Sequence, residues 1–175
     1  MDNQSPKNSH ISCCFTGHRP EHLPWGHMEA RQDYMDYYLK LCRATEDMIE
    51  AGCRVFYCGM ARGIDTMAAQ IVLGLRDARP ELCLKLIAVC PHVDQASFWS
   101  AKDRQMHAFL LSMADEAVIL APAYTPSCFH RRNRYMVDNC DYVIAGFDGV
   151  TKGGTASTVA YARRRGKQIL VVPPV

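Results

Sequence analysis

The sequence predicts an α/β fold, a doubly wound, mostly parallel Rossmann-like sheet with helices on both faces. Short apolar runs alternate along the chain with longer segments of helical periodicity. Several apolar runs are continuous instead of alternating apolar with polar residues, as is typical of parallel strands buried on both faces. Right-handed crossovers between such strands then place helices on the two faces of one sheet.

The first half of the chain supplies two strand–helix pairs. Residues 11–15 form the first expected strand, and a helix over 28–51 ends at Gly52. Residues 55–58 form the second strand and 63–76 the second helix. Helical spacing of apolar side chains supports both helices: Tyr34, Tyr38, Leu41, Thr45, Met48 and Ile49 in one, and Met67, Ala68, Ile71, Val72 and Leu75 in the other.

The second half continues the alternation. An apolar run over 84–90, closed by Pro91, is the third strand, and Asp94 is the expected N-cap of a helix that runs to Met113. The remaining expected elements are strands 117–121, 142–147 and 168–172 and helices 131–139 and 154–164.

The composition indicates one domain in a reducing compartment. Residues 1–10 are polar, lack the apolar core of a secretory signal and are expected to be a disordered lead-in. Residues 11–175 are expected to form a single domain around one core. Nine cysteines without an export signal favour reduced thiols and a cytoplasmic location, with Cys14, Cys58, Cys83 and Cys90 in or beside apolar runs.

Charge and hydropathy disfavour two partner classes. The formal net charge of +2 is too small to indicate a nucleic-acid binder on bulk electrostatics. No apolar run approaches the roughly 20 residues that cross a bilayer, so no membrane partner is expected.

Ligands of doubly wound sheets bind beyond the carboxyl ends of the strands, and the turn after the second expected strand is the richest of these loops. It contains Gly59, Arg62 and Gly63, followed by Asp65 and Thr66 at the start of a helix. A strand that turns into a helix directs free N–H groups and the positive helix end at one point, which suits a phosphate. An ordinary turn, in which the glycines only relieve strain and Asp65 only caps the helix, explains the same residues.

A second anion cradle is expected near the C-terminus. Gly153 and Gly154 open a helix and are followed by Thr155, Ser157 and Thr158, which bring hydroxyl groups. We expect the amides of the two turns to converge on one anion. Glycine and hydroxyl clusters also mark plain loops and N-caps, so that interpretation stays open here too.

Further ligand contacts are expected from other loops. Gly17 permits close backbone approach, and Arg19 can bind a phosphate or carboxylate. Arg132 and Asn133 are expected to reach the same site. Gln95 and Trp99 are candidates for reading and stacking a base, although a tryptophan at this spacing is more often core.

No metal site or required cofactor is expected. His18, His22 and His27 are close in sequence, but their spacing matches no zinc pattern. The chain also lacks the Gly-x-Gly-x-x-Gly dinucleotide fingerprint, the P-loop and the Gly-x-Ser-x-Gly nucleophile elbow.

Several short motifs resemble one group of bacterial proteins. The stretch 59–65 is similar to the glycine-rich loop of the DprA (Smf) proteins, and Arg132-Asn133-Arg134 and Gly153-Gly154-Thr155 resemble later motifs of that group. Together with residues 16–20 and with Pro91, Gln95 and Trp99, they most resemble the YpsA/YoqJ-like family of the SLOG superfamily, over residues 11–173.

The resemblance implies a Rossmann-like domain that binds a nucleotide or a nucleotide-derived phosphorylated ligand, such as an ADP-ribose-like or NAD-like molecule, as a sensor or signalling module. The alternative is a LOG-like hydrolase of nucleotide N-glycosidic bonds. The glutamate of the LOG motif is missing after Thr155, so Asp65 or Asp148 would have to replace it. DprA-like binding of single-stranded DNA is a third implication, which the low net charge disfavours. A homodimer is left open.

Overall fold

A parallel six-stranded sheet forms the centre of the computed structural model, which describes residues 11–150 and 152–174. The strands are β1 (Ile11–Gly17), β2 (Cys53–Cys58), β3 (Lys85–Cys90), β4 (Glu116–Ile119), β5 (Tyr142–Gly146) and β6 (Gln168–Val171). Their order in the sheet is β4-β3-β2-β1-β5-β6, and every neighbouring pair is parallel. The predicted α/β Rossmann-like fold is confirmed.

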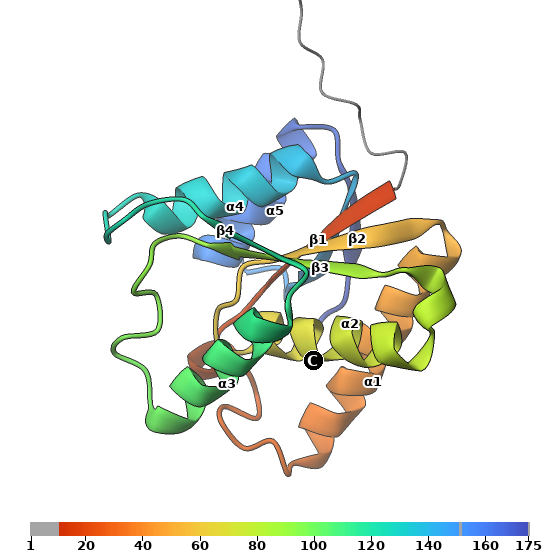
Figure 1. Cartoon of the computed structure of the whole chain (residues 1–175), viewed down its shortest axis with the longest axis horizontal. Coiled ribbons are helices and arrows are strands. Elements are labelled where there is room, and N and C mark those ends of the chain that lie inside the picture. Colours follow the sequence, from red (N-terminus) through yellow and green to blue (C-terminus); the bar gives the residue numbers. More distant parts are fainter. Residues whose placement is uncertain (1–10, 151, 175) are drawn as a thin grey trace, which may run out of the picture.

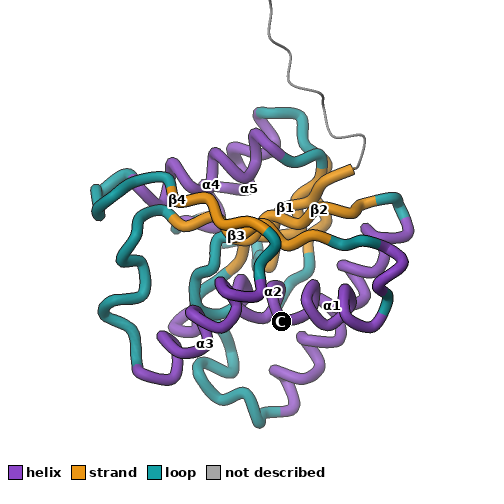
Figure 2. Tube along the Cα trace, in the orientation of Figure 1, coloured by secondary structure: helices purple, strands orange, loops and turns teal. Residues whose placement is uncertain are grey.

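Helices cover both faces of this sheet (Figure 1). The helices are α1 (Gln32–Glu50), α2 (Ile64–Ala78), α3 (Ala101–Met113), α4 (Cys128–Asn139) and α5 (Gly154–Arg164), with short 3-10 turns at Pro20–His22 and Pro80–Leu82. In Figure 2, α1, α2 and α3 lie on one side of the orange strands, and α4 and α5 lie on the other.

Alternate residues of the strands supply two apolar layers. Cys13 and Phe15 of β1 belong to the larger core, which also contains residues of α1 and α2. Cys14 of the same strand packs with Val143 and with Met136 of α4 on the opposite face. Burial on both faces explains why the strands are continuous apolar runs in the sequence.

Two expectations need correction, and a third is untested. The helix predicted from Asp94 begins only at Ala101, and residues 91–99 form turns instead. Among the cysteines expected to be buried, Cys83 is exposed, in a left-handed turn with φ of 51°. The expected lead-in over residues 1–10 lies outside the described part of the chain.

The true N-cap of α3 is Ser100, whose Oγ accepts a hydrogen bond from the Asp103 N–H at 3.1 Å. We expect Ser100→Ala to lower the free energy of unfolding by about 1 kcal/mol, because the first turn loses an acceptor. The matched control is Asp94→Ala, which should change stability by less than about 0.5 kcal/mol. Urea unfolding monitored by circular dichroism measures both, and a larger loss in the Asp94 variant would contradict the assignment of the cap.

The sheet order creates one switch point. Because β1 lies between β2 and β5, the chain leaves β1 toward one face and β5 toward the other. The loops that follow β1 and β5 therefore diverge at their carboxyl ends, where doubly wound sheets open a crevice for ligands.

Candidate functional site

A cavity of about 920 Å³ lies at this switch point. Residues of the loops after β1 and β5 meet there with one face of α4 and the start of α5. The lining residues are Phe15, Thr16, Gly17, His18, Arg19, His22, Ala61, Asp65, Phe129, His130, Arg132, Asn133, Met136, Asp148, Val150, Lys152, Gly153, Gly154, Thr155 and Ser157. Its volume is in the range of ordinary small-molecule sites.

The start of α5 is open toward ligands. Gly153 has φ of 101°, a conformation that glycine adopts at little cost, and no side chain caps the helix. No described residue accepts a hydrogen bond from the N–H groups of Gly154 or Thr155. A Cβ atom added to Gly153 or Gly154 would meet nothing within 4 Å. Free donors, open space and the positive helix end together make this turn suitable for an anion.

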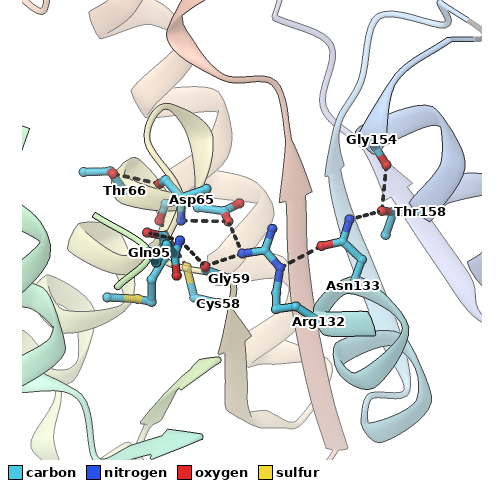
Figure 3. Close-up of polar contacts among 11 residues, drawn as sticks. Cys58, Gly59, Asp65, Thr66, Gln95, Arg132, Asn133, Gly154 and Thr158 are labelled. Atoms are coloured by element: carbon cyan, nitrogen blue, oxygen red, sulfur yellow. Dashed lines mark hydrogen bonds and ion pairs between the residues drawn. The ribbon is translucent and has the colours of Figure 1, made fainter. Parts of the chain in front are cut away.

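Arg132 of α4 is the buried centre of the polar network (Figure 3). Its Nη1 donates to the carbonyl of Gly59 and lies 3.9 Å from Oδ2 of Asp65. Its Nε donates to Oδ1 of Asn133 at 2.7 Å. Arg132 thereby connects the turn after β2 with helix α4.

Burial raises the pKa of the Asp65 carboxyl, and the Arg132 guanidinium and the Ala61 N–H oppose that rise. Burial also lowers the pKa of Arg132, against the attraction of Asp65. Each group thus favours the charged form of the other against the effect of burial, which indicates a structural ion pair at the back wall of the cavity.

Two further hydrogen bonds extend the network to α5. Nδ2 of Asn133 donates to Oγ1 of Thr158 at 2.8 Å, and that hydroxyl donates to the carbonyl of Gly154 at 2.8 Å. The network therefore holds the first turn of α5 in a fixed orientation relative to α4 (Figure 3). Asn133 and Thr158, both expected as ligand contacts, have this positioning role in the structure.

The turn after β2 differs from the expected anion cradle. The Ala61 N–H donates to Oδ2 of Asp65 at 3.2 Å, and the Ile64 N–H donates to the carbonyl of His18 at 3.3 Å. Added Cβ atoms would lie 2.8 Å from Asp65 Oδ2 at Gly59 and 2.6 Å from the His18 carbonyl oxygen at Gly63. These glycines pack against protein, so the expected convergence of two sets of free amides needs correction.

Gly17 likewise has a packing role, because a Cβ atom there would lie 2.6 Å from Cβ of Ile64. Its backbone lines the cavity all the same. Arg19 is exposed at the rim, with its guanidinium 5.0 Å from the centre of the Phe129 ring.

Arg62, Thr66 and Trp99 line a second cavity, of about 450 Å³, and not the first. Arg62 donates to Oε1 of Glu21 at 2.6 Å and lies over the Trp99 ring, 5.7 Å from its centre. Thr66 donates to the carbonyl of Ala61. Gln95 is buried, and its Nε2 donates to the carbonyls of Gly59 and Met60 at 3.2 and 3.0 Å. The geometry gives these four residues packing and loop-bracing contacts.

Asp148 brings a carboxylate to the first cavity. Its Oδ1 lies 3.0 Å from Nε2 of His18 and accepts a hydrogen bond from the Val150 N–H at 3.0 Å. The backbone hydrogen bond from Val150 is the main reason that the pKa of Asp148 is lowered, and His18 adds to it. Asp148 is therefore an ionised carboxylate at neutral pH and suits the role of a base better than that of an acid.

Sequence reasoning missed several lining residues, above all Phe129, His130 and Lys152. Phe129 lies between two cations, with Arg19 at 5.0 Å and Arg132 at 5.9 Å from its ring centre. Helical spacing was the available signal: Phe129, Arg132, Asn133 and Met136 share one face of α4. It was overlooked because the helix was expected to begin only at residue 131, after Phe129.

Within residues 11–150 and 152–174, no group of three or more His, Cys, Asp or Glu side chains is arranged to hold a metal ion. No helix in the described part of the chain is both long and apolar enough to cross a bilayer.

The model of the YspA SLOG family matches residues 13–171, nearly the whole described sheet and its helices. The chain belongs to the YspA SLOG family. The SPbeta prophage-derived protein YoqJ of Bacillus subtilis (strain 168) is 28% identical over 138 residues, which cover 71% of this chain and 79% of YoqJ. A UPF0398 protein of Bacillus pumilus (strain SAFR-032) is 26% identical over 136 residues, which cover 76% and 71%. The resemblance seen in the motifs of this SLOG protein is confirmed.

Proposed function

We propose that this SLOG-family protein binds a nucleotide or a nucleotide-derived phosphorylated ligand, of the ADP-ribose or NAD kind, as a sensor or signalling module. The observation that carries the proposal is the start of α5, where the N–H groups of Gly154 and Thr155 lack acceptors among the described residues and adjoin the 920 Å³ cavity. A phosphate bound there accepts these hydrogen bonds and neutralises the helix dipole.

The other residues of the cavity suit a nucleotide better than inorganic phosphate. Arg19 and Lys152, both exposed at its rim, supply positive charge for the phosphate. Phe129 and Met136 supply apolar surface on the α4 side, which suits a base or a ribose. Asp65 and Arg132 form the back wall and keep it polar but internally neutral. No required cofactor enters this proposal.

Gly154→Pro tests the phosphate contact directly. Proline at the first position of a helix keeps the helical backbone but removes the N–H donor. We expect its affinity for AMP, measured by isothermal titration calorimetry, to fall by about tenfold or more, the equivalent of one charge-assisted hydrogen bond.

The matched control is Gly154→Ala, which retains the N–H and introduces a Cβ atom into open space. We expect it to keep affinity within about threefold of the unmodified protein. Equal affinity in the alanine and proline variants would show that the phosphate does not bind at the start of α5.

Hydrolysis of an N-glycosidic bond is the second candidate function, and the Asp148–His18 pair in the cavity favours it. A panel of nucleoside monophosphates, analysed by chromatography for free base, separates the two functions. Binding without base release supports the sensor. Base release that Asp148→Asn abolishes supports the hydrolase. A cytoplasmic location and single-stranded DNA binding stay predictions.

A further inference from the structure

A third cavity, a groove of about 600 Å³, lies between α4 and α5. These two helices run side by side on the same face of the sheet (Figure 1). Three arginines line the groove, Arg131 and Arg134 from α4 and Arg164 from α5. None of its lining residues is acidic.

The three arginines are exposed and lack carboxylate partners within the described chain. Arg134 and Arg164 instead lie over the ring of Tyr161, at 5.3 and 5.7 Å from its centre. Their neighbour Arg165, in contrast, donates to Asp138 at 3.0 Å. Two of the three positive charges therefore lie over one aromatic ring, and none of the three forms an ion pair with a carboxylate of the described chain. Asp138, the carboxylate on this side, accepts hydrogen bonds from the Tyr161 hydroxyl and from Arg165.

The groove adjoins the first cavity. His130, Asn133 and Ser157 line both. The start of α5 and the three arginines therefore lie on either side of these shared residues, and a single ligand that passes Ser157 would contact both.

We propose that this groove binds a second phosphate of the same ligand, and that the ligand is of the dinucleotide class, with two phosphates separated by a nucleoside. Adjacent phosphates, as in a diphosphate, would both remain at the start of α5, whereas two joined cavities with separate positive charges match phosphates that are further apart. This inference rests on the phosphate site of the proposed function at the start of α5. Among nucleotide-derived ligands it favours one with separated phosphates over the diphosphate of an ADP-ribose-like or NAD-like molecule.

The test compares two probes by isothermal titration calorimetry on the full chain: AMP, and a diadenylate that carries a 5′-phosphate. We expect the diadenylate to bind about tenfold more tightly than AMP, because its second phosphate gains charge-assisted contacts. In the double variant Arg134→Gln/Arg164→Gln this preference should disappear, while the affinity for AMP stays within about twofold.

The control is Arg163→Gln, which removes one positive charge, half of the charge removed in the double variant, from an exposed residue of α5 outside the groove. We expect it to retain the preference for the diadenylate. Circular dichroism and the melting temperature verify that each variant is folded.

Each alternative outcome has a distinct meaning. AMP binding with no preference for the diadenylate, or an equal loss of preference in the Arg163 control, overturns the second phosphate site and leaves the proposed function intact. If neither AMP nor the diadenylate binds, both the second phosphate site and the proposed function are overturned. Affinity that keeps rising from the diadenylate to a dodecamer assigns the groove to nucleic acid and overturns the dinucleotide class.

Discussion

Replacement of Arg132 by methionine should lower the free energy of unfolding by about 3–5 kcal/mol. The reason is the loss of one partner of a buried ion pair: Asp65 keeps the Ala61 N–H but loses the cation 3.9 Å away. The Gly59 carbonyl keeps only its hydrogen bond from Gln95. Urea unfolding of the two proteins gives the difference.

Arg131→Met is the matched control for this variant. It changes the adjacent arginine, which is exposed, and should alter stability by less than about 0.5 kcal/mol. The double variant Arg132→Met/Asp65→Asn should recover part of the loss, because the buried charge is gone. A similar loss in the Arg131 and Arg132 single variants would show that the buried ion pair contributes no more to the free energy of unfolding than an exposed arginine does.

The loss caused by Arg132→Met should also depend on pH. Burial already raises the pKa of Asp65, and removal of the guanidinium that opposes this shift raises it further. A carboxyl with a folded-state pKa above its unfolded value binds protons preferentially in the folded protein, so stability falls as pH rises through the folded-state value. The deficit should therefore be larger at about pH 8 than at about pH 5, and Asp65→Asn should abolish that difference.

Substitution of Gly63 by alanine should cost about 2–5 kcal/mol of folding free energy. Two effects add. Gly63 has φ of 86°, which an alanine adopts only at a cost of about 1–2 kcal/mol. Its Cβ atom would also lie 2.6 Å from the His18 carbonyl oxygen and 3.1 Å from Cα of Arg19, and this overpacking adds about 1–3 kcal/mol.

Gly149→Ala separates the two effects. Gly149 has φ of 89°, but a Cβ atom there meets nothing within 4 Å. Its alanine variant should show the backbone cost alone, about 1–2 kcal/mol. Equal losses at the two positions by urea unfolding would mean that the contact between the turns after β1 and β2 relaxes freely.

The comparison of Gly63 with Gly153 explains why half of the predicted anion site differs from the structure. Both glycines have positive φ and both precede a helix. In the sequence they are equivalent signals for a phosphate-binding turn. Only packing separates them: the backbone of the first turn fills the space at Gly63, while Gly153 faces open space.

Two arginines, one in a loop and one in a helix, show the same limit. Arg62 and Arg132 both follow a strand at the carboxyl edge of the sheet, and both were expected at the ligand. Glu21 and Trp99 hold Arg62 in a second cavity, whereas Arg132 lies buried at the back wall of the first. The direction of a long side chain depends on partners distant in sequence, and one amino-acid sequence does not show which partners those are.

The amino-acid sequence by itself determined the order of strands and helices, the parallel sheet and the edge at which the first cavity lies, because these follow from local periodicity and from the handedness of crossovers. It also located the open turn at Gly153 and Gly154. The tertiary structure alone decided which turn keeps its amides free, which arginine is buried and which side chains of α4 complete the cavity. Those outcomes depend on contacts between segments far apart in the chain, which place backbone 2.6 Å from an added Cβ atom at Gly63 and leave nothing within 4 Å at Gly153.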